Sequence, residues 1–134
     1  MSLFNVFNIS GSAMQAQTVR MNTTASNLAN ADSVSSTKDD AYKAKHPVFA
    51  AELSAQREAV GVNVKGIYES DAEPVMRHSP GHPLANEDGY IFESNVNTIE
   101  EMVNMISASR SYQNNVEVMN TSREMLMKTL SLGK

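Results

Sequence analysis

The most regular hydrophobic pattern in the chain lies in TIEEMVNMISASRSYQNNVEVMNTSREMLMKTLSLG, residues 98–133. Apolar side chains recur there every seven residues, and a companion row three or four residues away completes one helical stripe. The pattern predicts a helix on the order of 50 Å long, at about 1.5 Å per residue. The first row is Met105, Tyr112, Met119 and Leu126, and the companion row is Met102, Ser109, Val116, Arg123 and Leu130.

Residues at both ends of this stretch have the chemistry of helix caps. Asn97 or Thr98 can cap the N-terminus, and Thr98 with Glu101 fits a capping box. Gly133 fits the glycine that commonly ends a helix at its C-terminus. We therefore expect the helix to fill nearly the whole C-terminal end of the chain.

The N-terminal end repeats the seven-residue step, with Phe7, Met14, Met21 and Leu28, and predicts a helix from about residue 3 to residue 30. Arg20 is the only charged side chain before residue 32. A solvated helix carries charges on its outer face, so this one suits contact with another protein surface, although a flexible polar tail is the alternative. The many methionines fit either core filling or an adaptable interface.

Two long helices at the ends of so short a chain cannot each curl into a compact domain, so we expect them to pair as a coiled coil. The predicted fold class is mainly α with a small β part, in which long terminal helices flank a short middle module rich in β-hairpins. The expected divisions are residues 1–31 for the N-terminal helix, 32–93 for a loop and the β-rich module, and 94–134 for the C-terminal helix.

In the middle of the chain, the sequence predicts an exposed loop at 32–40, followed by short strands within 42–53, 62–67, 73–77 and 90–92. Pro47 restricts the first strand to an edge or a break, and Gly66 suggests a bulge in the second. We expect the segment 73–77 to pair with the strand at 62–67. The segment 78–83 has turn chemistry.

Composition excludes several classes of protein. The chain has 134 residues, a net charge of −4 and no cysteine, which argues against nucleic-acid binding, disulfide scaffolds, thiolate zinc sites and cysteine nucleophiles. No window is apolar enough to span a membrane. The N-terminus lacks the pattern of a cleavable signal peptide, so we expect any export to use another route.

The sequence contains only weak signals for catalytic, metal-binding or glycosylation sites. His78 and His82 stand four residues apart, but Pro80 and Gly81 between them forbid the helix that a metal pair at this spacing needs. The segment 35–38 matches a serine-enzyme motif without its companion motifs. Glycosylation triplets begin at Asn8, Asn22 and Asn120, all inside predicted helices. We expect no enzyme activity, no cofactor and no metal.

Both ends of the chain resemble bacterial flagellar rod and hook proteins. At the N-terminus the resemblance rests on SGSAMQAQTVRM (10–21) and ASNLAN (25–30), and at the C-terminus on SNVN (94–97) and EMVNMISASRSYQ (101–113). The short middle, with PGHP (80–83) and DGY (88–90), resembles that of the proximal rod members of this family.

The resemblance implies a structural subunit of the flagellar basal body, in a periplasmic helical tube that transmits torque and forms part of the export channel. It implies partners among copies of the chain, other rod proteins, a rod-base adaptor and the export gate, with no nucleic acid and no direct membrane insertion. Export would use the flagellar type III system without a cleaved signal. The terminal helices would pair along the tube wall, through an assembly interface of Phe7, Met14, Met21, Leu28, Met102, Met105, Tyr112, Val116, Met119, Leu126 and Leu130.

Two other functions fit the residues alone. One is a soluble coiled-coil adaptor of fixed small oligomeric state, and the other, weaker, is a metal-dependent enzyme at the His78/His82 loop. For the leading function, we expect the termini to be largely disordered in the free monomer and to become ordered on assembly.

Overall fold

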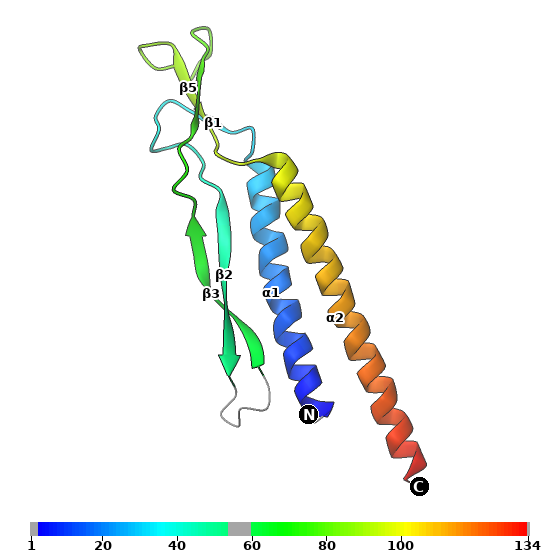
Figure 1. Ribbon diagram of the computed structural model, residues 1–134. Coiled ribbons are helices and arrows are strands. Elements are labelled where there is room, and N and C mark those ends of the chain that lie inside the picture. Colours follow the sequence, from blue (N-terminus) through cyan, green and yellow to red (C-terminus); the bar gives the residue numbers. More distant parts are fainter. Residues whose placement is uncertain (1–2, 54–59, 134) are drawn as a thin grey trace.

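The computed structural model describes residues 3–53 and 60–133 and has two long helices and two small antiparallel sheets (Figure 1). The predicted fold class, mainly α with a small β part, is confirmed to that extent. A long β-hairpin lies along one side of α1 and α2 lies along the other, while a smaller sheet sits at one end. The elements are α1 (Leu3–Ala29), β1 (Val34–Ser35), β2 (Lys45–Leu53), β3 (Val60–Glu69), β4 (Val75–His78), β5 (Tyr90–Glu93) and α2 (Thr98–Leu132).

Both terminal helices form where the sequence predicts them. α1 ends in a turn in which the backbone N–H of Asn30 donates to the carbonyls of Ser26 and Asn27. It has no acidic residue in its first turn and no basic residue in its last, so side-chain charges do not complement its dipole. Because its Asn, Ser and Thr residues also favour other conformations, α1 depends on packing for its stability.

The start of α2 differs in one detail from the expectation. Asn97 is the N-cap, and its side chain accepts hydrogen bonds from the backbone N–H groups of Ile99 and Glu100. The capping box of Thr98 and Glu101 is therefore wrong, because Thr98 is already helical and Glu101 turns inward. At the other end Gly133 is the C-cap, as predicted.

The β2–β3 hairpin confirms two expectations about strand irregularities. β2 pairs only with β3, so Pro47 lies in an edge strand of a two-stranded sheet. The register shifts at Val48 and Phe49, which face Gly66 and Val64, and this leaves Lys65 as the extra residue of a bulge.

The second sheet corrects two expectations. β4 pairs with β5 and not with β3, because the segment after β3 carries the chain to the far end of the molecule. β5 also pairs with β1, a two-residue strand inside the predicted loop 32–40. The turn between β4 and β5 contains Gly89, whose φ is +77° and whose added Cβ would lie 3.2 Å from His78 Nε2.

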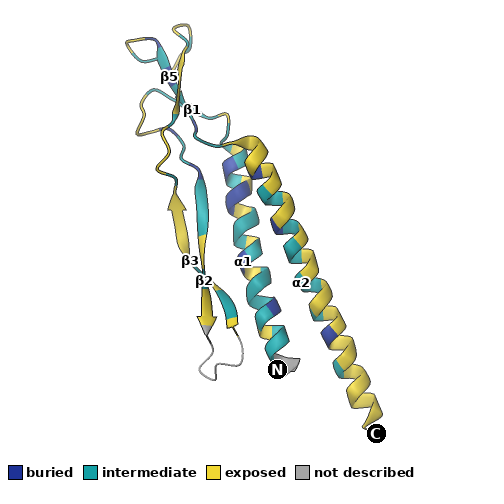
Figure 2. Cartoon of the chain, viewed as in Figure 1, coloured by how far each residue is buried: buried dark blue, intermediate teal, exposed yellow. Residues whose placement is uncertain are grey.

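The apolar core of the chain is small. Among residues 5–52 and 60–133, Ile91 of β5 is the only large apolar side chain that is buried, and the other buried apolar residues are alanines (Ala16, Ala41, Ala44 and Ala108). Figure 2 shows α2 exposed along most of its length, with isolated buried positions on the side facing α1. So small a core contributes little to the stability of a chain of this length.

Candidate functional site

α2 turns one face toward α1, which is the only described helix or strand that it packs against. Along this face Glu101, Ala108 and Ser122 are buried. Half-buried side chains alternate with them at steps of three and four residues, a spacing that keeps all of them on one side of the helix. These half-buried residues are Met105, Tyr112, Asn115, Met119 and Leu126.

The predicted first row of α2 thus lies on the inward face, whereas the companion row does so only in part: Ser109 and Val116 are half-buried, but Met102, Arg123 and Leu130 are exposed. The inward companions are Glu101, Ala108, Asn115 and Ser122, each one residue earlier than predicted. Small and polar side chains at these positions let α1 approach closely: Glu101 accepts a hydrogen bond from the Asn27 side chain, and Asn115 and Ser122 donate to carbonyls of α2 itself. Apolar periodicity alone therefore misses them.

The predicted interface residues differ in their exposure to solvent. The four residues of α1 (Phe7, Met14, Met21 and Leu28) are half-buried, as is Val116 of α2. Met102 and Leu130 are 53% and 63% exposed. Leu28 follows Asn27 in α1, and Asn27 bonds to Glu101 near the start of α2. Leu126 lies roughly 40 Å farther along α2, at about 1.5 Å per residue. Leu28 and Leu126 therefore cannot contact each other within one chain.

The outer face of α2 carries an exposed apolar cluster, which we call the outer patch. It consists of Ile99, Met102, Val103 and Ile106, whose spacing places them together on the side of the helix away from α1. Each is more than half exposed, and Ile99 reaches 74%. Farther along the helix, Val118, Met125 and Leu132 repeat every seven residues and are also exposed.

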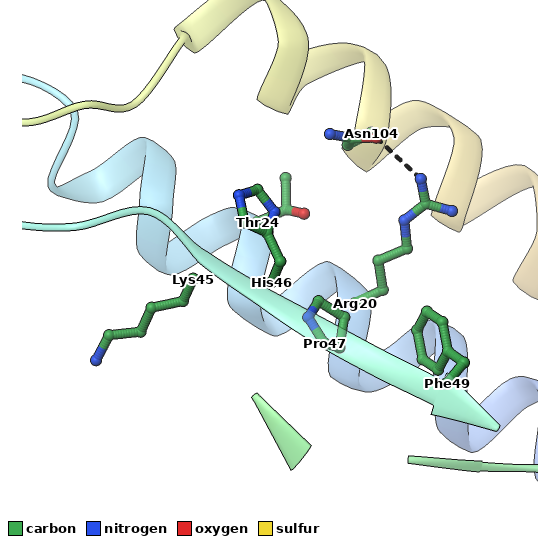
Figure 3. A pocket seen from close by; sticks show the side chains of 7 residues that line it. All are labelled: Arg20, Thr24, Lys45, His46, Pro47, Phe49 and Asn104. Atoms are coloured by element: carbon green, nitrogen blue, oxygen red, sulfur yellow. Dashed lines mark hydrogen bonds between the residues drawn. The ribbon is translucent and has the colours of Figure 1, made fainter. Parts of the chain in front are cut away.

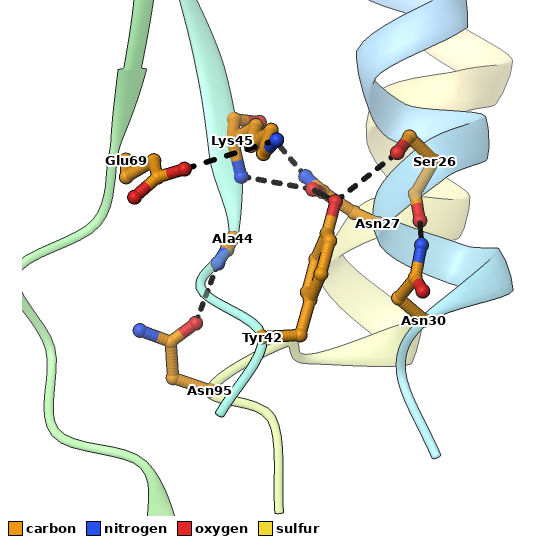
Figure 4. A network of polar contacts seen from close by, with 8 residues as sticks. All are labelled: Ser26, Asn27, Asn30, Tyr42, Ala44, Lys45, Glu69 and Asn95. Atoms are coloured by element: carbon orange, nitrogen blue, oxygen red, sulfur yellow. Dashed lines mark hydrogen bonds and ion pairs between the residues drawn. The ribbon is translucent and has the colours of Figure 1, made fainter. Parts of the chain in front are cut away.

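A buried polar network, which we call the joint, connects α1, α2 and β2. Figure 4 shows its contacts between α1 and β2. At its centre is Asn27, which is fully buried. Its Oδ1 accepts from the backbone N–H of Lys45 (2.8 Å) and from the Tyr42 hydroxyl (3.1 Å). Its Nδ2 donates to the carbonyl of Lys45 (2.8 Å) and to Oε2 of Glu101 (3.0 Å). One amide side chain therefore holds three elements together.

A second asparagine extends the joint toward the smaller sheet. Asn95 accepts from the backbone N–H of Ala44 (2.7 Å) and donates to the carbonyl of Ala72 (2.7 Å). Nearby, the Ser94 hydroxyl donates to the carbonyl of Ala31. These contacts fix the segment before α2 against the segment after α1.

Sequence reasoning missed the joint, although a signal for it was present. Asn27 and Asn95 both lie in the motifs ASNLAN and SNVN that carry the family resemblance. Asparagine can bond to both a backbone N–H and a backbone carbonyl, as Asn27 does with Lys45. Asparagines in a nearly chargeless stretch were thus a pointer to buried bridging contacts.

The weaker candidate sites do not assemble into a chemical centre. His82 Nδ1 accepts from the backbone N–H of Leu84, and the His78 ring packs against Tyr90. Lys38 pairs with Glu73, and this ammonium holds the pKa of the Glu73 carboxyl below its usual value. Within residues 3–53 and 60–133, no group of three or more His, Asp or Glu side chains is placed to hold a metal ion.

Asn8, Asn22 and Asn120 lie inside helices, as expected. Neither α1 nor α2 is long and apolar enough to cross a membrane.

Comparison with known proteins gives matches at both ends of the chain. Residues 7–35 match the family described as "Flagella basal body rod protein", and residues 87–132 match "Flagellar basal body rod FlgEFG protein C-terminal". Flagellar basal-body rod protein FlgC of Salmonella typhimurium is 48% identical over 134 residues, covering all of both chains. FlgC of Yersinia enterocolitica is also 48% identical over the full lengths, and FlgC of Buchnera aphidicola from Acyrthosiphon pisum is 46% identical.

Proposed function

Because the chain belongs to the family of flagellar basal-body rod proteins, we propose that its helix pair forms part of the wall of the proximal rod, a helical tube in the periplasm. The chain is a structural subunit of the basal body and not an enzyme, and it assembles with other components of that structure. The resemblance found in its terminal motifs is confirmed.

One observation carries the proposal of a tube wall. Large apolar side chains of α2 lie exposed in the outer patch and beyond it, while only one large apolar side chain is buried among residues 5–52 and 60–133. Exposed apolar surface of this kind is covered in the functional state of a soluble protein. Contacts that repeat between subunits without closing a ring produce an open helix, which is the symmetry of a rod.

In the proposed wall, some residues of the predicted assembly interface would form contacts within the chain and others would form contacts between subunits. The half-buried rows of both helices, among them Met14 and Tyr112, would pack as a coiled coil within the chain. Met102 and Leu130, which are exposed, would contact neighbouring subunits. Antiparallel packing of α1 and α2 in Figure 1 supports such a wall element.

In the proposed tube, the two ends of the chain and its middle would occupy different layers. Residues 1–31 and 94–134 would form the core of the tube, and residues 32–93 an outer layer. The tube would transmit torque and form part of the export channel. Its neighbours would be copies of the chain, other rod proteins, the rod-base adaptor and the export gate. A helix pair with so small an apolar core is suited to passing unfolded through the flagellar type III system.

The small core also leads to a prediction for the free monomer. In a dilute monomer, backbone amides of residues 5–28 and 100–128 are expected to exchange with solvent with little protection, because the helices gain most of their burial from neighbours. Hydrogen exchange followed by mass spectrometry measures this. Strong protection of both segments in a verified monomer would show that the helix pair is stable alone.

The proposed function is tested by deleting the gene in its own organism and restoring an intact copy. Electron microscopy is expected to show loss of every structure beyond the inner-membrane ring, and recovery of rod, hook and filament with the intact copy. Normal filaments in the deletion strain, with no duplicate gene, would contradict the proposal. A fixed small oligomer with folded helices would then favour the coiled-coil adaptor.

A further inference from the structure

A hollow of about 360 Å³ lies where β2 passes alongside the helix pair (Figure 3). Arg20 and Thr24 of α1, Asn104 of α2, and His46 and Phe49 of β2 are among the residues that line it. The hollow is therefore formed by three separate elements, and Lys45, which is bonded to Asn27 in the joint, also lines it.

Arg20 is the notable residue of this hollow. It is the only charged side chain in the first 31 residues, and it is half-buried. One of its guanidinium nitrogens donates to Asn104 Oδ1 (2.9 Å). Among residues 3–53 and 60–133, no carboxylate forms an ion pair with it. A half-buried guanidinium with a single neutral acceptor is only partly compensated for its loss of water.

The other groups around the hollow do not supply the missing negative charge. None of the lining residues is acidic. Lys45 also lines the hollow, but in Figure 3 its side chain points away, and its ammonium lies 3.8 Å from Glu69. The positive charge of Arg20 is thus left at a hollow whose other lining residues are Thr24, Lys45, His46, Pro47, Phe49 and Asn104.

We propose that this hollow receives an aspartate or glutamate side chain of a neighbouring rod subunit, whose carboxylate pairs with Arg20. The inference rests on the proposed function, because only assembly brings a second chain to this surface. A guanidinium presents parallel N–H groups that match the two oxygens of a carboxylate. Phe49 also lines the hollow and is 39% exposed, so a neighbouring subunit that covers it would exclude water from the pair and so strengthen the pair.

Such a pair would also select the partner. A neutral or basic side chain entering the hollow would leave Arg20 unpaired and further desolvated, so the free energy of Arg20 would be higher in that complex than in the free subunit. The nearly chargeless surface of α1 offers few other electrostatic contacts, so this one position would fix the register between subunits.

The test uses the Arg20→Lys variant, because carbodiimide joins a lysine amine to a carboxylate only when the two are in contact. Basal bodies purified from cells carrying this variant are treated with carbodiimide, digested and analysed by mass spectrometry. We expect an amide bond between residue 20 and an acidic residue of a neighbouring subunit. Wild-type basal bodies are the control, since arginine does not form this bond.

The outcomes separate the inference from the proposed function. Basal bodies that contain the variant but give no cross-link at residue 20, or one only within the same chain, would overturn the inference while leaving the rod function intact. Absence of the wild-type chain from purified basal bodies would instead contradict the proposed function.

A second experiment covers the case in which Arg20→Lys does not assemble. Arg20→Glu is expected to lower the number of basal bodies at least tenfold, and reversal of one acidic residue to arginine in a neighbouring rod subunit is expected to restore it. Thr18→Glu, on an exposed part of the same helix, is the matched control and should assemble. Normal assembly of Arg20→Glu would overturn the inference.

Discussion

A strain carrying Met119→Lys is expected to be non-motile and to lack rods. Met119 belongs to the inward row of α2 and is half-buried in the single chain. In the proposed tube wall its surroundings are further desolvated, and an unpaired ammonium there costs on the order of several kcal/mol per subunit. Because the cost recurs at every copy, swimming in soft agar and electron microscopy of basal bodies should both report a complete loss.

Two controls make this result specific. Met119→Leu nearly conserves volume and should cost less than about 1.5 kcal/mol, so motility is retained. Ser36→Lys adds the same charge in the connection between α1 and β2, at a side chain with no hydrogen bond among the described residues, and should also remain motile. Equal motility of Met119→Lys and Ser36→Lys would show that Met119 is not part of a packed contact.

Asn27→Ala is expected to disrupt the joint and to lower the number of assembled basal bodies at least tenfold. The substitution leaves the Glu101 carboxylate and both backbone groups of Lys45 without their partner. Each unsatisfied buried group costs about 1–3 kcal/mol, and together we expect a loss of about 3–5 kcal/mol per subunit. In the basal bodies that still form, amides of residues 44–46 should exchange faster than in the wild type.

Asn22→Ala is the matched control for this prediction. Asn22 lies on the same helix, is exposed and has the same side chain, so its replacement by alanine changes helix propensity only slightly. Basal-body numbers should be unchanged. If Asn27→Ala assembled as well as Asn22→Ala, the joint would not be the element that holds α1, α2 and β2 together.

The helices could be predicted from the sequence because their signals are local. A seven-residue repeat and the caps around Asn97 and Gly133 act within a few turns, and the structure has both helices where they were expected. The bulge near Gly66 and the edge position of Pro47 are local in the same sense.

Pairings between distant segments could not be predicted in this way. Short strands such as Val75–His78 do not specify which strand they join, and β4 pairs with β5 across a turn rather than with β3. The inward companion row of α2 begins at Glu101 because that carboxylate bonds to Asn27, 74 residues earlier. A buried glutamate contradicts the usual hydrophobic pattern, so periodicity placed the row one residue too late.

The most direct test of the account concerns the outer patch. The chain has no cysteine, so Val103→Cys introduces a single thiol on the face of α2 opposite α1. We predict that a maleimide reagent labels this thiol fully in the free chain and leaves it protected in purified basal bodies, while Asp88→Cys in the turn before β5 is labelled in both. Equal labelling of Val103→Cys in the two states would contradict the claim that neighbouring subunits cover this helix in the rod.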